Sequence, residues 1–176
     1  MTMKRLSAIL LLLLLGVVAA LAQGDWTKYT SPEGRYNVLL PREPSLSSQD
    51  GTAPSGEKFT QYLAATPDST GDLFMVAYFD YTAGMVFSFD KARDGMVAAV
   101  KGTLVSERPI SLGSSPGREL KVLARAPTGN EYMVLARYYQ VGTRIYVVQM
   151  IVQKSDEANL ASPKATRYFD SFQVSK

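Results

Sequence analysis

The sequence predicts an α+β fold in which a curved, mostly antiparallel sheet is flanked by helices. Three observations support this prediction. Strand-like segments recur along the chain, short turns containing glycine or proline separate the later ones, and two segments show helical periodicity. Strands joined by short turns pair antiparallel, and amphipathic helices bury their apolar stripes against such a sheet.

Residues 1–22 predict a cleaved secretory signal peptide. A cationic start precedes an apolar run over 8–18, and small residues lead to Ala22. A membrane span would need about 20 apolar residues, whereas polar residues follow at once, and no cysteine follows to carry a lipid. The remaining 154 residues, 23–176, predict one domain. We therefore expect an exported protein, periplasmic or extracellular, with no stable membrane anchor after cleavage.

The composition excludes several classes of function. Two of the 19 basic residues lie in the signal segment, which leaves 17 against 16 acidic residues and no basic excess for nucleic acid. The chain contains no histidine and no cysteine. Thiol catalysis, histidine proton transfer and the common zinc sites are therefore unavailable. We expect no cofactor, no metal and no catalytic residue.

The first half of the mature chain predicts strands interrupted by a loop. A hairpin is expected from strands at 26–30 and 35–40, joined by a turn with proline and glycine. The polar segment 41–57 has no periodicity and predicts a long exposed loop. Strands are then expected at 58–66 and 73–81, and the second is apolar on both faces, so it requires cover on both sides.

A helix is expected over 87–102, because apolar residues recur there with helical spacing. Ser88 is a suitable N-cap, and Gly102 suits a left-handed stop. Gly95 lies inside this helix, where glycine costs up to about 1 kcal/mol relative to alanine. We interpret Gly95 as a sign of close packing against a strand.

The second half of the chain predicts a series of hairpins followed by a helix. The expected strands, separated by short turns, are 103–112, 117–126, 131–140 and 143–153. Ser162 followed by Pro163 marks the start of a final helix. Its expected buried stripe is Ala165, Tyr168, Phe169 and Phe172.

The segment GSSPG, residues 113–117, matches the G-x-S-x-G pattern that carries the nucleophilic serine of many hydrolases. Ser115 lacks the surroundings that this chemistry needs. Pro116 has no N–H for an oxyanion hole, the following residues alternate as a strand, and no histidine is present to act as base. The segment predicts a β-turn.

Three arrangements of carboxylates are candidate sites. Asp90 and Asp94 lie one helical turn apart, but basic neighbours favour a solvated, self-neutralising face. Residues 68–72 place oxygen ligands in a turn, as calcium sites do, yet lack EF-hand spacing, and a plain hairpin loop is favoured. A glycosidase-like carboxylate pair has no identifiable partners in the sequence.

Two candidate binding sites emerge from the apolar residues. The connection around Met85, Val86 and Phe87 has no polar alternation, and is either a loop folded over the core or an exposed patch that docks a partner. The loop expected at 42–57 is a second interaction candidate. Tyr138, Tyr139 and Tyr146 are candidates for a ligand pocket between helix and sheet.

Several segments together resemble a family of small exported bacterial proteins with a PsbP/Mog1-like fold. They are WTKYTSPEGRYNVLLPREP, VAYFDY, ARDG, KGTLVSERPISLGSSPGREL and RYFDSF, and their order spans nearly the whole mature chain. The resemblance implies a sheet sandwiched between helices. PsbP-like proteins are extrinsic, non-catalytic subunits or assembly factors, and Mog1 proteins bind a small GTPase, but neither partner is transferred to this chain.

These observations lead to one principal expectation of function and two alternatives. The principal one is an exported, non-enzymatic domain that binds another envelope or secreted protein in an accessory or assembly role. The first alternative is a small-ligand-binding protein with a tyrosine-lined pocket, and the remote one is a carboxylate-based hydrolase. The sequence names neither the partner nor the oligomeric state.

Overall fold

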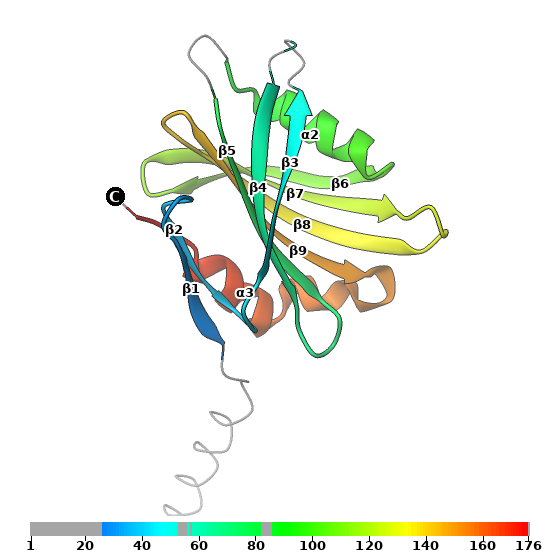
Figure 1. The fold of residues 1–176 in the computed structure, drawn as a ribbon. Helices are drawn as coiled ribbons and strands as arrows, with labels where there is room; N and C mark the ends of the chain where they lie inside the picture. Colours follow the sequence, from blue (N-terminus) through cyan, green and yellow to red (C-terminus); the bar gives the residue numbers. More distant parts are fainter. Residues whose placement is uncertain (1–25, 53–55, 57, 82–85, 176) are drawn as a thin grey trace, which may run out of the picture.

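The computed structural model of the protein describes residues 26–52, 56, 58–81 and 86–175, and the expected signal peptide lies outside these ranges. The described residues form an α+β fold with two antiparallel sheets, which confirms the predicted fold class. The large sheet has seven strands in the order β3-β4-β5-β9-β8-β7-β6, and the small sheet has the order β1-β2-β10. Figure 1 shows that the large sheet is strongly twisted.

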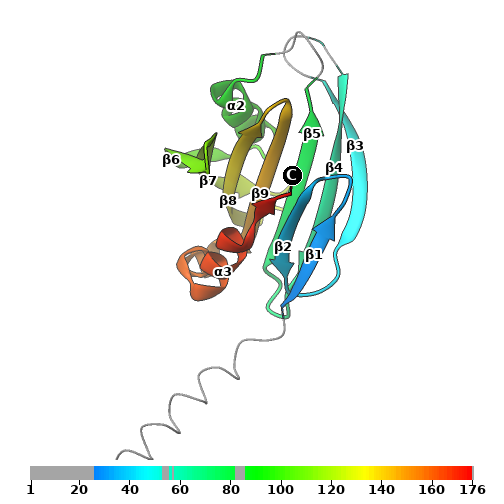
Figure 2. The same cartoon turned by 90° about the vertical axis from the view of Figure 1, so that its left-hand side faces the viewer.

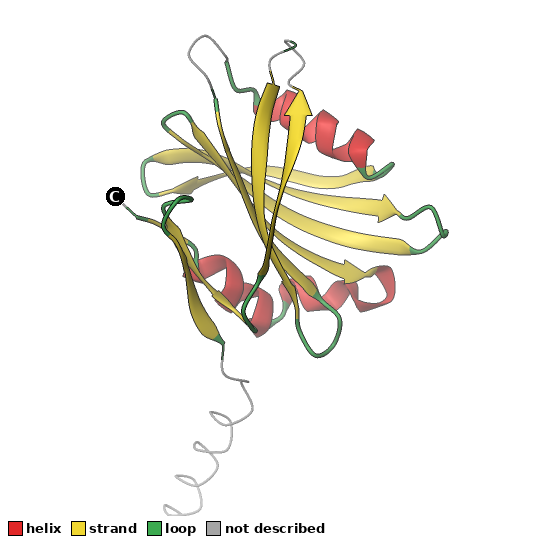
Figure 3. Cartoon of the chain, in the orientation of Figure 1, coloured by secondary structure: helices red, strands yellow, loops and turns green. Residues whose placement is uncertain are grey.

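Within the described residues, the elements are strands and three helical segments (Figure 3). The small sheet consists of β1 (Thr27–Ser31), β2 (Tyr36–Leu40) and β10 (Gln173–Val174). The large sheet consists of β3 (Ser45–Thr52), β4 (Lys58–Pro67), β5 (Leu73–Asp80), β6 (Thr103–Leu112), β7 (Ser115–Arg125), β8 (Glu131–Val141) and β9 (Arg144–Gln153). The helical segments are α2 (Phe89–Ala99), the 3-10 helix η1 (Lys154–Ala161) and α3 (Pro163–Ser171).

The large sheet is covered on both faces. One face packs against α2, and the other packs against α3, η1 and the small sheet, as Figure 2 shows in side view. Strand β5 contributes alternate residues to the two cores, Val76 and Tyr78 to one and Ala77 and Phe79 to the other. Its apolar character on both faces is thereby explained. In the described part of the chain, no helix has the length and apolar composition that a membrane span requires.

Local signals in the sequence account for the hairpins and the helix starts. Strands β6 to β9 pair in sequence order through short turns, as predicted. The Ser88 and Ser162 hydroxyls accept backbone N–H bonds at the first turns of α2 and α3. The predicted stripe of α3, from Ala165 to Phe172, is buried.

Strand β3 corrects the prediction of a long loop over 41–57. Residues 45–52 pair antiparallel with β4 from Ser45 opposite Ala65 to Thr52 opposite Lys58. Seven of the eight residues of β3 are exposed, so the segment carries no apolar alternation that could have predicted a strand. Backbone pairing with β4, rather than burial of its side chains, holds β3 in the sheet.

Two predictions about glycines in and after α2 are wrong. Lys101, with φ of 47°, takes the left-handed conformation expected of Gly102. Gly102 is instead required by close approach, since a Cβ there would overlap the carbonyl oxygen of Leu123. Gly95 does not pack against a strand, because a Cβ at this position would meet no atom of another part of the structure within 4 Å.

Candidate functional site

Of the three residues predicted to dock a partner, the structure describes two, which lie in different surroundings. Met85 lies outside the described residues. Val86 is 88% exposed. The Phe87 ring packs edge-on against Tyr81 and Phe89, at centroid distances of 5.5 and 4.9 Å. Phe87 thus contributes to the core beneath α2, and Val86 is the described residue of this trio that projects into solvent.

The three tyrosines predicted to line a pocket are buried on two different faces of the large sheet. Tyr138 lies in the core on the α2 side, where burial raises its pKa. Tyr139 and Tyr146 lie in the opposite core, and Tyr139 stacks on Phe172. The Tyr146 hydroxyl donates to the Gly34 carbonyl oxygen at 2.7 Å. These contacts give the three tyrosines packing roles and do not gather them around one cavity.

A different set of tyrosines lines a solvent-open hollow of about 390 Å³ between the β1–β2 hairpin and strands β3 to β5. We call it the tyrosine groove. Its walls come from both sheets, so it lies at a boundary where the small sheet does not cover the large one completely. The lining residues are Tyr29, Ser31, Glu33, Tyr36, Leu46, Ser47, Tyr62, Leu63, Ala64, Tyr78, Asp80 and Arg144.

The aromatic rings of the groove form a connected series. Tyr62 and Tyr78 are cross-strand partners on β4 and β5, and their rings stack at 5.1 Å. Tyr36 meets Tyr78 edge-on at 6.3 Å, and Tyr29 meets Tyr36 at 6.1 Å. Tyr36 and Tyr78 are buried, while Tyr62 remains 45% exposed. The exposed Tyr62 ring therefore offers an aromatic surface that rests on a rigid base.

Arg144 fixes one end of the groove. Its guanidinium donates two hydrogen bonds of 2.7 Å to the Asp80 carboxylate and a third to the Glu33 carbonyl oxygen. The same guanidinium lies over the Tyr78 ring, 4.7 Å from its centroid. Hydrogen bonding from Arg144 lowers the pKa of Asp80, so this carboxylate stays ionised and paired at neutral pH. The contact to Glu33 joins the β1–β2 turn to the large sheet.

The tyrosine hydroxyl groups in the groove have raised pKa values. Burial raises the pKa values of Tyr29, Tyr36 and Tyr78 above the ordinary value. These tyrosines therefore remain protonated at neutral pH, where they donate and accept hydrogen bonds. A phenolate nucleophile would need the opposite shift.

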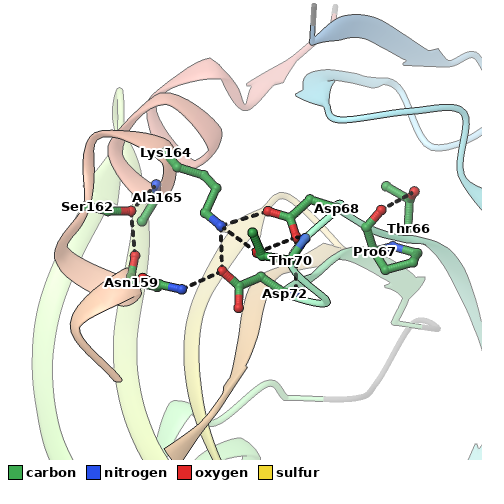
Figure 4. A network of polar contacts seen from close by, with 9 residues as sticks. All are labelled: Thr66, Pro67, Asp68, Thr70, Asp72, Asn159, Ser162, Lys164 and Ala165. Atoms are coloured by element: carbon green, nitrogen blue, oxygen red, sulfur yellow. Dashed lines mark hydrogen bonds and ion pairs between the residues drawn. The ribbon is translucent and has the colours of Figure 1, made fainter. Parts of the chain in front are cut away.

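In the oxygen-rich turn at 68–72, the Lys164 ammonium contacts the oxygen atoms that a calcium ion would need as ligands (Figure 4). The Lys164 ammonium donates to Asp68 Oδ2 at 2.7 Å, to Asp72 Oδ2 at 2.5 Å and to Thr70 Oγ1 at 3.2 Å. Asn159 adds a hydrogen bond of 2.9 Å to Asp72. The turn is thus a hairpin loop whose two carboxylates share one lysine from the first turn of α3.

The other sequence candidates are engaged in structural contacts. Asp94 pairs with the Arg93 Nε at 2.8 Å, and Asp90 pairs with Arg118 at 2.8 Å. Ser115 begins β7 opposite Leu112, so the turn between the strands is Gly113–Ser114, and the remaining residues of GSSPG belong to β7. Within the described ranges, no group of three or more carboxylates is arranged to hold a metal ion.

Sequence reasoning missed the groove because its tyrosines come from separate strands. Tyr29, Tyr36, Tyr62 and Tyr78 meet through strand register and through packing of the two sheets. The sequence did contain a signal against the predicted pocket. Adjacent residues on a strand face opposite sides of the sheet, so Tyr138 and Tyr139 cannot line one cavity. No comparable local signal joins β1 and β2 to β4.

Comparison with known proteins supports the fold. Neither a protein-family model nor the sequence of a curated protein matches the chain. Among solved structures, cyanobacterial PsbP (CyanoP) from Synechocystis sp. PCC 6803 is similar with a TM-score of 0.60 at 12% identity, over 86% of this chain and 93% of that one. The chain therefore has a PsbP-like fold.

Two further structures show weaker similarity. PA94, a Pseudomonas aeruginosa protein of unknown function, gives a TM-score of 0.41 at 12% identity, over 82% of this chain and 95% of its own. A Bacteroides thetaiotaomicron VPI-5482 protein gives 0.47 at 16% identity, over 86% of this chain and 49% of its own.

Proposed function

We propose that this protein is an exported, non-catalytic binding domain, and that the tyrosine groove is where a secreted or envelope protein docks. The observation that carries the proposal is the groove itself. It combines a rigid aromatic wall with two large apolar side chains left in solvent, Tyr62 at 45% and Leu46 at 67% exposure. Partly exposed aromatic clusters are typical of protein contact sites.

The chemistry of the groove supports binding rather than catalysis. Asp80 is neutralised by Arg144, and the groove tyrosines Tyr29, Tyr36 and Tyr78 are held in their protonated form. The chain has no histidine or cysteine to supply a base or nucleophile at neutral pH. Export is inferred from the cationic and apolar segment at 1–22.

Site-specific photo-cross-linking in the native cell envelope tests this proposal. A photoreactive residue at Leu46 should capture a partner protein, because this side chain borders the groove. The matched control is Val105, which is 51% exposed and lies on β6 at the opposite edge of the same sheet. A partner captured at both positions, or at neither, would contradict docking at the groove.

A small ligand is the second candidate occupant, because the volume of about 390 Å³ falls within the range of ligand pockets. Native mass spectrometry of protein purified from its host would reveal such a ligand as a fixed added mass. The mass should disappear in a Tyr62→Ala variant and persist in a Val105→Ala variant if the groove holds it.

A further inference from the structure

The two edges of the large sheet differ in their protection against pairing with another strand. At one edge, β6 carries a register shift between Leu104 and Ser106, the charged pair Glu107 and Arg108, and then Pro109. Bulges, charges and proline are the devices by which proteins block edge pairing. The β6 edge is therefore closed to an added strand.

The other edge lacks these devices. Strand β3 runs for eight residues, SLSSQDGT, with regular pairing to β4 and with Asp50 as its one charged residue. It ends the large sheet, and in the described structure no strand pairs with its outer side. Figure 2 shows β3 at the margin of the molecule. Its outward N–H and C=O groups are available to an extended segment.

Strand register places this edge beside the tyrosine groove. Ser48 lies opposite Tyr62, and Tyr62 lies opposite Tyr78, so the three side chains share one face of the sheet. Because Ser48 is small, a long side chain on an added strand can cross it and reach the exposed Tyr62 ring. Leu46 lies on the same face, two residues earlier on β3.

A carboxylate on this face offers a partner for a cation. Asp50 follows Ser48 by two residues and therefore shares its face. Its Oδ1 accepts a hydrogen bond of 3.0 Å from Thr60, and no ion pair joins Asp50 to any described residue. An arginine guanidinium can stack on the Tyr62 ring and at the same time approach the Asp50 carboxylate. Arg144 makes the same two kinds of contact, with the Tyr78 ring and with Asp80.

We infer that the partner adds an extended segment to the outer edge of β3 and places an arginine, opposite Ser48, on the Tyr62 ring. This inference rests on the proposed function and specifies the chemistry of the partner. Main-chain hydrogen bonds along β3 supply affinity, and the arginine pocket formed by Tyr62 and Asp50 supplies selectivity.

Peptide binding to protein purified after expression of the full chain tests the inference. The probes are peptides as long as β3 that alternate threonine and valine and carry arginine, alanine or glutamate at one central position. We expect the arginine peptide to slow hydrogen exchange of β3 amides, and the alanine peptide to bind about threefold to tenfold more weakly. The glutamate peptide should bind most weakly of the three.

Variants at the two edges provide the controls. Ser48→Arg, at an exposed position, places a competing guanidinium on Tyr62 and should abolish the preference for the arginine peptide over the alanine peptide, while Ser106→Arg on β6 should leave that preference unchanged. If Ser48→Arg failed to fold, Asp50→Asn should still reduce the preference for arginine over alanine. Retained arginine preference in a folded Ser48→Arg variant would overturn the pocket.

Other outcomes separate this inference from the proposed function. Equal binding of all three peptides would contradict the arginine pocket. Capture of a partner at Leu46 without protection of the β3 amides from hydrogen exchange would contradict strand addition. In both cases docking at the groove would stand. If the protein were a dimer in which the β3 amides are protected from hydrogen exchange without peptide, the β3 edge would pair with a second copy of the chain. That result would overturn the inference.

Discussion

The Lys164 ammonium lies 2.5 Å from Oδ2 of Asp72, a residue that is only 3% exposed. Lys164 is in the first turn of α3, and Asp72 is in the turn between β4 and β5, 92 residues earlier. This contact joins the C-terminal helix to the large sheet. Because Asp72 is buried, its charge must be balanced by a partner within the protein.

Replacement of this lysine should destabilise the fold. Lys164→Met leaves Asp72 buried with Asn159 as its remaining side-chain partner, and we expect the free energy of unfolding to fall by about 2 kcal/mol. Urea unfolding at neutral pH measures the change. Lys91→Met, at an exposed position of α2, is the control and should change stability by less than about 0.5 kcal/mol. Equal losses of stability in both variants would show that the contact between Lys164 and Asp72 does not stabilise the fold.

The same loop should make stability depend on acid pH. Burial tends to raise the pKa of Asp68, but hydrogen bonds from Lys164 and Thr70 outweigh it and lower the pKa below the ordinary value. A carboxyl whose pKa is lower in the folded state stabilises the protein above its unfolded pKa. That contribution is lost as pH falls through the folded pKa.

We therefore expect Asp68→Asn to be less stable than the wild type at neutral pH, and the difference to shrink as the pH is lowered below about 4. Urea unfolding across this pH range measures it. A stability difference that stayed constant with pH would show that ionisation of Asp68 contributes nothing.

Two glycines should respond to alanine in opposite directions. Gly95 lies in the middle of α2 with open space around it, so Gly95→Ala should raise the free energy of unfolding by up to about 1 kcal/mol. At Gly117 a Cβ would lie 2.5 Å from the Tyr138 carbonyl oxygen, so Gly117→Ala should lower it by about 1 to 3 kcal/mol. Thermal and urea unfolding of the two variants check both signs.

Two tyrosines should separate stability from binding. Tyr146→Phe removes the hydrogen bond to the Gly34 carbonyl oxygen and should cost about 1 to 2 kcal/mol of stability, with no change in partner capture at Leu46. Tyr62→Ala should reduce that capture strongly while the protein remains folded, since the Tyr62 ring is partly in solvent. Reduced capture in Tyr146→Phe at a temperature where it is fully folded would assign Tyr146 a binding role.

Local patterns account for the parts of the fold that were predicted correctly. The hairpins from β6 to β9 follow from short turns between apolar strands, and the start of α3 follows from Ser162 and Pro163. In each case the residues that specify the element are close neighbours in the chain. The sequence also predicted that β5 is covered on both faces, because its apolar residues occupy both alternating sets of positions.

The candidate site was not predictable in the same way. Strand β3 is specified by its backbone pairing with β4, and its exposed side chains leave no periodic signal. The tyrosine groove depends on how the small sheet lies against the large one, which joins Tyr29 and Tyr36 to Tyr62 and Tyr78. Composition indicated that tyrosines were abundant but not which of them meet.

The sequence by itself determined the fold class, the hairpin order of the second half and the absence of histidine and cysteine chemistry. It could do so because turns, caps and periodicity act between residues close in the chain. Only the tertiary structure decided that Lys164 pairs with both carboxylates of the 68–72 turn, that β3 is an unprotected edge and that four tyrosines share a groove. These contacts join distant segments, and their geometry is set by strand register and by packing of the two sheets.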